Sequence, residues 1–564
     1  MNLNGEWDFS FDRDVFDKKI IVPFAYQSKL SGINSREPHD VVWYRRTFEV
    51  KEEWKEKIIL LHFGAVDYEC DIWVNEVHIG HHIGGHSSFY FDITSALKED
   101  TNSVMLKVTD KVTDLEMPRG KQYWKDGQES IFYTRTTGIW QTVWLEAVDR
   151  VYINRTKITP DLDHKSVFIE YEIFGSESRN LEIEIYFRNK RVTDLLLKDC
   201  KDHGVIKIDL DQRILKKWNF QEELTWSPEK PRLFNVYFAI WQDDIQKDYV
   251  ESYFGMRKIS IENGKILLNN RLYYQKLVLD QGYWKESLLT APSDDAFVYD
   301  IEAAKKMGFN GARKHQKIED PRYLYHADVL GFLVWGEIAS AYIYSDKYVE
   351  RITSEWIEML ERDYNHPCIV AWTPLNESWG VPNISCNSNE QAHSAAMVYL
   401  TKSLDQTRPV ISNDGWEHTC TDILSIHDYE EDEHILRERY KDKDCILKSS
   451  PAGRKIFADG WDYAAQPIMV TEFGGISYSS ELQEGWGYST AVSGEEFLEK
   501  YHSIVTSILG SGEIQGFCYT QLTDIEQEIN GLMTYDRKPK VPFEKIKEIN
   551  DGTWRRIGCK EMKE

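Results

Sequence analysis

The chain has 564 residues and a mass of 66.2 kDa, which is too much polypeptide for one hydrophobic core. Hydrophobic residues make up 41% of it and the mean hydropathy is −0.52, values typical of a water-soluble globular protein. The formal net charge of −25 argues against nucleic acid or an anionic membrane surface as a partner. The length of the chain predicts about three or four domains.

The opening segment, MNLNGEWDFSFD, has neither the basic part nor the apolar part of a secretory signal. No stretch approaches the roughly 18 apolar residues that a membrane helix needs. The eight cysteines lack CxxC spacing and are expected to be reduced thiols rather than disulfides or zinc ligands. They are Cys70, Cys200, Cys368, Cys386, Cys420, Cys445, Cys518 and Cys559. Together these features predict a cytoplasmic protein without a membrane segment.

Up to about residue 258 the hydrophobic pattern predicts β-strands almost exclusively. In residues 181–187 apolar and polar side chains alternate, as in a strand that is buried on one face. Similar runs occupy residues 103–108, 205–210 and 233–241. Because short strands separated by turn signals are typical of β-sandwiches, two such domains are expected. Residues 1–149 have the size of an N-terminal β jelly roll, and residues 150–258 that of an immunoglobulin-like β-sandwich.

From residue 259 to residue 564 helical and strand patterns alternate. Ser293 is expected to cap a helix that has Phe297, Ile301 and Ala304 on one face. Further helices are predicted over residues 347–364 and 392–404, and strands over 310–313, 368–375, near 410, 423–426, 468–471 and 515–519. Alternation over about 300 residues indicates a C-terminal (β/α)₈ TIM barrel.

Two glutamates stand where predicted barrel strands end. Glu377 follows the fourth strand and Glu472 ends the seventh. The carboxyl ends of barrel strands build the active site, and two carboxylates that face each other there can divide acid and nucleophile roles. In retaining glycosidases such a pair is about 5 Å apart. A single glutamate would more often be a solvated loop residue, but two at matching strand ends favour catalysis.

The flanking residues add a specific resemblance. Asn376-Glu377 after one strand and Thr471-Glu472-Phe473-Gly474 on a later one resemble glycoside hydrolase family 2, the family of β-galactosidases, β-glucuronidases and β-mannosidases. The likeness extends over almost the whole chain. It also rests on residues 42–46, 74–75, 84–86, 137–141, 226–231, 254–257, 531–532 and 535–540.

The resemblance implies roles for individual residues. Glu377 would be the acid/base, Glu472 the nucleophile, and Asn376 a ligand of the sugar 2-hydroxyl. Arg313 and Tyr429 would stabilise the ionised nucleophile, as a cation and a hydroxyl donor do, although Tyr429 could also be a half-buried loop aromatic. Ten further strand-end residues are candidates either for substrate contact or for structural support. They are Asp280, Gln281, Trp284, His315, Glu337, Asn413, Asp414, Trp416, Tyr519 and Gln521.

The sequence departs from the family's pattern at two places, after the eighth strand and after the third. Tyr519 stands where family members often carry Trp, and it is expected to stack on a sugar face. Magnesium-dependent β-galactosidases have a carboxylate and a histidine after the third strand, whereas here Ile338, Ala339 and Ser340 follow Glu337. His78, His81, His82 and His86 resemble metal ligands, but the glycines among them indicate a hairpin turn. No metal and no cofactor are therefore expected.

The predicted function is hydrolysis of an oligosaccharide or small glycoside with a neutral terminal sugar, by an exo-acting retaining enzyme of β-galactosidase-like specificity. The alternatives are α-L-arabinosidase or β-glucuronidase specificity, and, in a different class, a catalytically silent carbohydrate-binding protein. β-Glucuronidases of the family hold the sugar carboxylate with an Asn-x-Lys motif, but no lysine occurs between Leu522 and Arg537. A homo-oligomer is possible, and no partner other than substrate is indicated.

Overall fold

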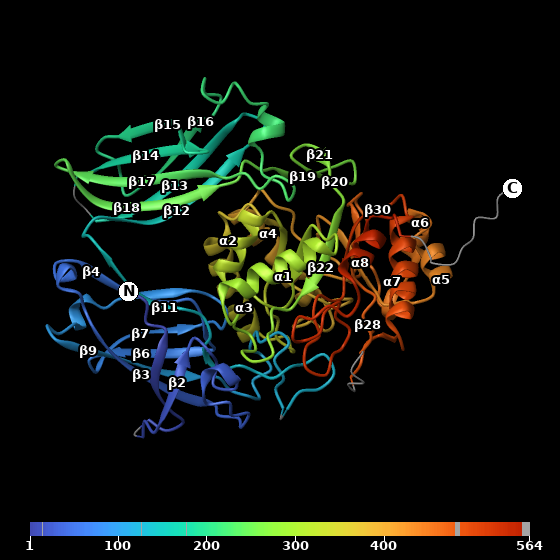
Figure 1. The fold of residues 1–564 in the computed structure, drawn as a ribbon, viewed down its shortest axis with the longest axis horizontal. Helices are drawn as coiled ribbons and strands as arrows, with labels where there is room; N and C mark the ends of the chain where they lie inside the picture. Colours follow the sequence, from blue (N-terminus) through green and yellow to red (C-terminus); the bar gives the residue numbers. More distant parts are fainter. Residues whose placement is uncertain (14, 126, 176–177, 480–484, 555–564) are drawn as a thin grey trace.

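The computed structural model describes residues 1–13, 15–125, 127–175, 178–479 and 485–554. Two β-domains lie one above the other, and both flank a barrel at the C-terminal end of the chain (Figure 1). This is the predicted fold class: a jelly roll, an immunoglobulin-like sandwich and a TIM barrel. In the ranges given above, no helix is long and apolar enough to cross a membrane.

The N-terminal domain consists of antiparallel sheets around one core. One sheet has the order β2-β1-β3-β9-β6-β7 and another the order β11-β4-β8. Their strands are β1 Gly5–Ser10, β2 Lys18–Val22, β3 Val41–Glu49, β4 Ile58–Phe63, β6 Glu69–Val74, β7 Val77–Ile83, β8 Phe89–Asp92, β9 Thr101–Thr109 and β11 Val143–Val148, with the short pair β5 Val66–Asp67 and β10 Gly138–Ile139 beside them. Buried Tyr44, Ile72 and Leu145 belong to one cluster, so both sheets share the core. Exposure alternates along β9, as its sequence predicts.

The second domain is a sandwich of two antiparallel sheets, β12-β13-β16 and β15-β14-β17-β18. Its strands are β12 Tyr152–Asp161, β13 Ser166–Phe174, β14 Asn180–Phe187, β15 Lys190–Leu197, β16 His203–Asp209, β17 Phe234–Gln242 and β18 Ile245–Phe254. Ile169 of one sheet and Ile183 and Phe238 of the other are fully buried in its core. The alternating pattern of residues 181–187 thus marks a strand with one face on the core.

The barrel strands are parallel and follow the order β25-β24-β23-β22-β30-β27-β26. They are β22 Gln275–Asp280, β23 Gly311–Lys314, β24 Leu333–Glu337, β25 Ile369–Thr373, β26 Leu424–Asp428, β27 Ile468–Phe473 and β30 Ile514–Tyr519. The helices are α1 Asp294–Lys306, α2 Pro321–Leu330, α3 Asp346–Asp363, α4 Ser388–Leu404, α5 Glu433–Arg439, α6 Lys443–Lys448, α7 Gly494–Leu509 and α8 Phe543–Asn550. Short strands β19 Ile259–Glu262, β20 Lys265–Leu268 and β21 Arg271–Leu272 precede the barrel, and β28 Ile476–Ser477 pairs with β29 Ser489–Thr490.

Three local predictions need correction. The expected strand near residue 410 is not a regular strand: isolated bridges join Trp372 to Val410 and Asn376 to Asp414, and they fill the place between β25 and β26. Ser293 is the N-cap of α1 by position, but its side chain makes no capping hydrogen bond. The turn of the β6–β7 hairpin is made by Asn75 and Glu76, with φ of 50° and 71°. His78, His81 and His82 therefore lie along β7 itself, and His86 follows its end.

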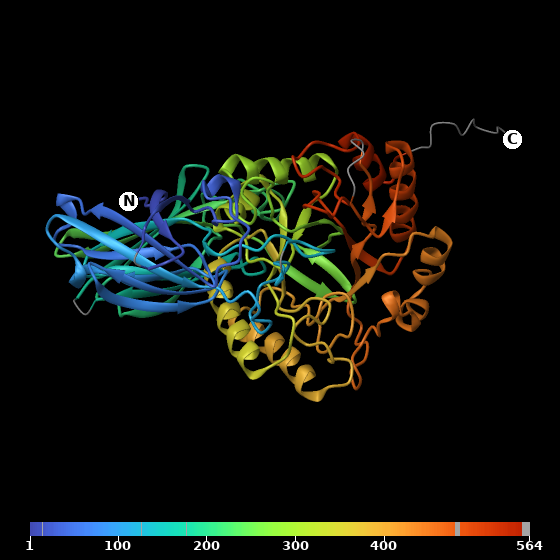
Figure 2. The ribbon, with the colours of Figure 1, turned by 90° about the horizontal axis from the view of Figure 1, so that it is seen from below.

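A long segment of the jelly roll, residues 110–125 and 127–137, leaves its own sheets and lies against the barrel, and Figure 2 shows it crossing between the two. The Gly120 amide donates to the Ser340 carbonyl at 3.0 Å, and the Tyr342 hydroxyl donates to the Gly120 carbonyl at 2.6 Å. The Thr134 amide donates to Glu526 at 2.8 Å. We call residues 110–125 and 127–137 the docking loop, because these bonds fix the N-terminal domain to the loops at the mouth of the barrel.

Candidate active site

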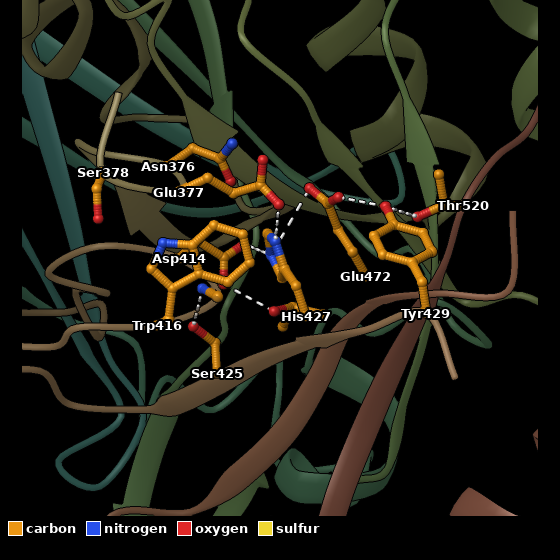
Figure 3. A network of polar contacts seen from close by, with 12 residues as sticks. Asn376, Glu377, Ser378, Asp414, Trp416, Ser425, His427, Tyr429, Glu472 and Thr520 are labelled. Atoms are coloured by element: carbon orange, nitrogen blue, oxygen red, sulfur yellow. Dashed lines mark hydrogen bonds and ion pairs between the residues drawn. The ribbon is translucent and has the colours of Figure 1, made fainter. Parts of the chain in front are cut away.

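Glu377 and Glu472 come together at the mouth of the barrel. Glu472 lies in β27, and Glu377 follows β25 with a left-handed φ of 50°, which turns the chain sharply there. One carboxylate oxygen of each lies within 4.8 Å of the other and of a His427 nitrogen, and Figure 3 shows the three side chains facing one another. This spacing matches the separation of about 5 Å found in retaining glycosidases.

Glu472 has strong stabilising partners. Arg313 donates from Nη1 to its Oε1 at 2.7 Å, and the Tyr429 hydroxyl donates to its Oε2 at 2.6 Å. Burial alone would raise the pKa of Glu472, but the positive charges of His427 and Arg313 hold that pKa well below its usual range. The Glu472 carboxylate is therefore ionised, which is the form that can attack carbon.

Arg313 is a hub for several strand ends. Its guanidinium is completely buried, with Nε 2.8 Å from Glu337 and 2.7 Å from Asp414, while Nη2 donates to the Asn376 amide oxygen at 2.5 Å. Burial raises the pKa of Glu337 to about 7 in spite of the neighbouring guanidinium. Arg313 thus holds Glu472 and Asn376 in place relative to Glu337, at the end of β24, and Asp414.

His427 is not among the predicted site residues, yet it is central to the site. Its Nδ1 lies 2.8 Å from Glu377 Oε1, while Nε2 lies 3.5 Å from Asp414 Oδ2 and 3.6 Å from Glu472 Oε1. A Cβ atom on Gly415, where φ is +106°, would come within 2.6 Å of His427 Nδ1. Glycine is therefore required beside the imidazole.

A second unpredicted residue comes from the other domain. Lys121 of the docking loop is only 7% exposed, and its ammonium lies 4.9 Å from the ring centre of Trp379, two residues after Glu377. Burial raises the pKa of Glu472, and the positive charge of Lys121, after the larger effects of His427 and Arg313, helps to lower it. Phe132 of the same loop packs on Trp379 with ring centres 5.5 Å apart. The jelly roll therefore supplies one wall of the site.

Several predicted residues support this arrangement through hydrogen bonds. Gln281 donates to Gln521 at 2.8 Å, and Gln521 donates to Asn530 at 2.7 Å. His315 Nδ1 lies 3.0 Å from Glu337, and burial lowers the pKa of this imidazole. Trp416 is half-buried, with its ring edge-on to His427 at 5.6 Å between centres.

Four other candidates have partners within the barrel, which favours structural support, one of the two roles that the sequence left open for them. Asp280 accepts from Lys314 at 2.6 Å, and Asn413 is completely buried, where it holds the backbone of Ser378 and Trp416. Trp284 packs on Phe297 within the barrel core. Tyr519 has no exposed surface because its ring is enclosed by neighbouring aromatic side chains, so it presents no face to a sugar.

Within the part of the chain that the structure describes, two groups of side chains are close enough to suggest a metal ion. In the site, Glu377 and His427 are in direct contact at 2.8 Å; away from it, Asp328 and His366 are in contact at 2.6 Å, beside Cys368. Two ligands of one zinc ion, each about 2.0–2.3 Å from it, stand further apart than this. Both groups therefore have the spacing of direct hydrogen bonds, and we assign no metal to either.

Comparison with known families decides the relationship. Residues 259–553 match the TIM barrel domain of the glycosyl hydrolases family 2. The chain belongs to glycosyl hydrolase family 2. Residues 9–147 match the sugar binding domain of that family and residues 151–257 a further family 2 domain, so the family relationship extends over all three domains.

Relatives in the family carry different names. The chain is 27% identical over 421 residues to a β-galactosidase of Thermoanaerobacter pseudethanolicus, covering 72% of this chain and 53% of that protein. It is 24% identical over 463 residues to a β-glucuronidase of Bacteroides fragilis, covering 76% of this chain and 63% of the relative. The chain thus spans about half the length of the first of these relatives.

The fold is shared with solved structures. A β-D-glucuronidase from Dictyoglomus thermophilum superposes with a TM-score of 0.79 at 19% identity, covering 98% of this chain and 96% of that one. A β-galacturonidase from Eisenbergiella tayi gives a TM-score of 0.76 at 18% identity, with the same coverage of 98% and 96%. At such identity the likeness concerns the arrangement of the three domains.

Proposed function

We propose that the protein is an exo-acting retaining glycoside hydrolase, with Glu472 as nucleophile and Glu377 as acid/base. The observation that carries this proposal is the pair of carboxylates within 4.8 Å, one surrounded by positive and hydroxyl donors and the other closer to solvent. Their side chains are 5% and 16% exposed, respectively. The more enclosed group suits attack on carbon, and the more open group suits proton exchange with the leaving group and water.

In the first step an oxygen of Glu472 bonds to the anomeric carbon as the bond from that carbon to the leaving oxygen breaks. Glu377 supplies the proton that the leaving oxygen takes. In the second step Glu377 accepts a proton from water, whose oxygen displaces Glu472. The Asn376 amide is oriented by Arg313 beside both glutamates and is the proposed partner of the sugar 2-hydroxyl.

For the substrate we propose a neutral terminal sugar and β-galactosidase-like specificity on an oligosaccharide or small glycoside. Glu528 stands near the place where the family's glucuronidases need a lysine, and burial raises the pKa of Glu528. Lys314 is held by Asp280 and Glu319, and Lys317 donates to the carbonyls of Gly282 and Leu289, so neither presents a free ammonium.

An acidic sugar is the second candidate, and Lys121 favours it. The Lys121 ammonium is buried at the site, and its charge opposes the rise in the pKa of Glu528 that burial causes. A sugar carboxylate beside this ammonium would gain a charge-assisted hydrogen bond.

We also propose a cytoplasmic location, which the free thiols of the seven described cysteines support; Cys559 lies outside the described residues.

The test is turnover of aryl β-galactoside, β-glucoside, β-glucuronide and α-L-arabinoside, with product anomers followed by NMR. Retention of configuration and a 2-fluoro sugar label on the peptide containing Glu472 are expected. An inverted product, a label on Glu377, or saturable binding without turnover would each contradict the proposal. The galactoside is expected to exceed the glucuronide in kcat/KM by about a hundredfold or more, since Glu528 would repel a sugar carboxylate and no lysine replaces it in that stretch. A glucuronide ranking first would favour the second candidate, with Lys121 as the partner of the carboxylate.

A further inference from the structure

His427 is in contact with both proposed catalytic glutamates. Figure 3 shows its ring between Glu377, Asp414 and Glu472. Nδ1 is 2.8 Å from Glu377, and Nε2 faces Asp414 and Glu472 at 3.5 Å and 3.6 Å. All three neighbours are carboxylates that accept hydrogen bonds, so protons on both ring nitrogens satisfy the site best.

The surroundings of His427 fix the ring in this orientation. The side chain has no exposed surface, Gly415 leaves room for the ring, and Trp416 packs edge-on against it. Asp414 is itself held by Arg313 at 2.7 Å and by the Thr471 hydroxyl at 2.8 Å. The imidazole therefore exchanges a proton most directly with Glu377, which is the partner closer to solvent.

We propose that His427 and Glu377 hold one proton between them, so that His427 is a positioning residue that stores the proton of the catalytic acid. This inference rests on the proposed function, because it assigns a source for the proton that Glu377 gives to the leaving group. An isolated glutamate carboxyl, with an ordinary pKa of about 4.3, carries few protons at neutral pH. A carboxyl paired with an imidazole keeps the shared proton to higher pH.

The proton balance is simple. In the resting pair the proton is on His427 Nδ1 and Glu377 is ionised; it then moves to Glu377 Oε1, which leaves a neutral imidazole. Glu377 gives this proton to the leaving oxygen as the anomeric carbon bonds to Glu472. In the second step water gives a proton to Glu377, which returns it to Nδ1. The pair is thereby restored after each turnover.

The charges around His427 agree with this role. Burial alone would lower the pKa of His427, but Glu472, Asp414 and Glu377 raise it to about 10. The other charged or titratable groups facing it are Arg313, which is bonded to Asp414 and Glu472, and the imidazoles of His315 and His418, whose pKa values burial lowers. A proton is thus retained at the pair up to alkaline pH and lost as the pH rises further.

The experiment compares the pH profiles of kcat/KM for wild type, His427→Asn and His427→Gln. With an aryl glycoside of poor leaving group, the alkaline limb is expected to move to lower pH by about one unit or more in both variants. A dinitrophenyl glycoside, which hardly needs the acid, is expected to lose about tenfold less rate than the poor substrate. His393→Asn is the matched control, since His393 is also buried but packs on Tyr344 and Tyr348.

An unchanged alkaline limb with equal losses on both substrates would overturn the role of His427. If wild type turns over no glycoside, the proposed function itself fails, so the two failures are distinguishable. Should neither His427 variant fold, ¹⁵N-histidine NMR of wild type at pH 8 decides. One of the 16 histidines is expected to keep both ring nitrogens protonated and to titrate at lower pH in Glu377→Gln. Absence of such a signal would contradict the proposal.

Discussion

The two glutamates at the barrel mouth have the same chemistry but opposite surroundings. Glu472 is held at both oxygens, by the guanidinium of Arg313 and by the hydroxyl of Tyr429. Glu377 has one side-chain partner among the described residues, the imidazole of His427, and its side chain is three times as exposed. Environment rather than residue type therefore distinguishes the two glutamates, and it is the basis of the different roles proposed for them.

The sharpest way to break this comparison is to remove the nucleophile. Glu472→Ala is expected to lose activity by a factor on the order of 10⁵ or more, because a covalent intermediate cannot form. With azide and an activated substrate, this variant should give a glycosyl azide of inverted configuration, which NMR identifies. A retained azide would mean that the roles of the two glutamates are exchanged.

Removal of the acid should have a smaller and more selective effect. Glu377→Ala is expected to lose about 10²–10⁴-fold on substrates with poor leaving groups, and much less on those with acidic leaving groups. Azide should restore turnover with a glycosyl azide of retained configuration. Equal losses on every leaving group without azide rescue would contradict the assignment of Glu377.

The support of Glu472 can be tested without removing a charge from the core. Tyr429→Phe deletes one hydrogen bond to the carboxylate, worth about 1.5–3 kcal/mol, and should lower kcat about ten- to a hundredfold. Tyr501→Phe is the matched control, because the buried Tyr501 hydroxyl donates to Asn550 outside the site. Normal kinetics in Tyr429→Phe would make Tyr429 a structural aromatic stacked on Tyr488.

The smallest expected effect concerns the wall supplied by the jelly roll. Lys121→Met should lower kcat/KM by about tenfold, because one charge-assisted contact is lost. Lys125→Met, on the exposed part of the same loop, is the control. A loss confined to the glucuronide would favour an acidic substrate, whereas equal loss on neutral sugars would assign Lys121 to hydroxyl recognition. No change with any sugar would remove Lys121 from the binding site.

Much of the fold could be predicted because the signals are local. The alternation of residues 181–187 and the apolar face of α3 depend only on neighbours in sequence, and both elements are confirmed. The prediction of a regular strand near residue 410 was wrong, because the pairing of this segment depends on the barrel around it and consists of isolated bridges. The expected stacking of Tyr519 on a sugar depends on tertiary structure in the same way, since the sequence pattern does not show that Tyr501 of α7 covers its ring.

The two unpredicted site residues show the same limit. His427 owes its role to carboxylates at other strand positions, and Lys121 comes from another domain, nearly half of the chain away from Trp379. Motifs that mark strand ends locate Glu377 and Glu472, but they do not report what the folded chain brings beside them. Electrostatic partners of this kind follow from tertiary structure.

The docking loop makes the proposed active site a joint property of two folding units. Thr134 and Tyr133 bind Glu526 and Glu528 of the barrel, so the wall of the site exists only while the jelly roll remains seated. Gentle denaturation that separates the domains should abolish turnover while far-ultraviolet circular dichroism still records intact barrel helices. The enzyme would then lose its activity in a step that precedes, and is separable from, the melting of the domain that holds both glutamates.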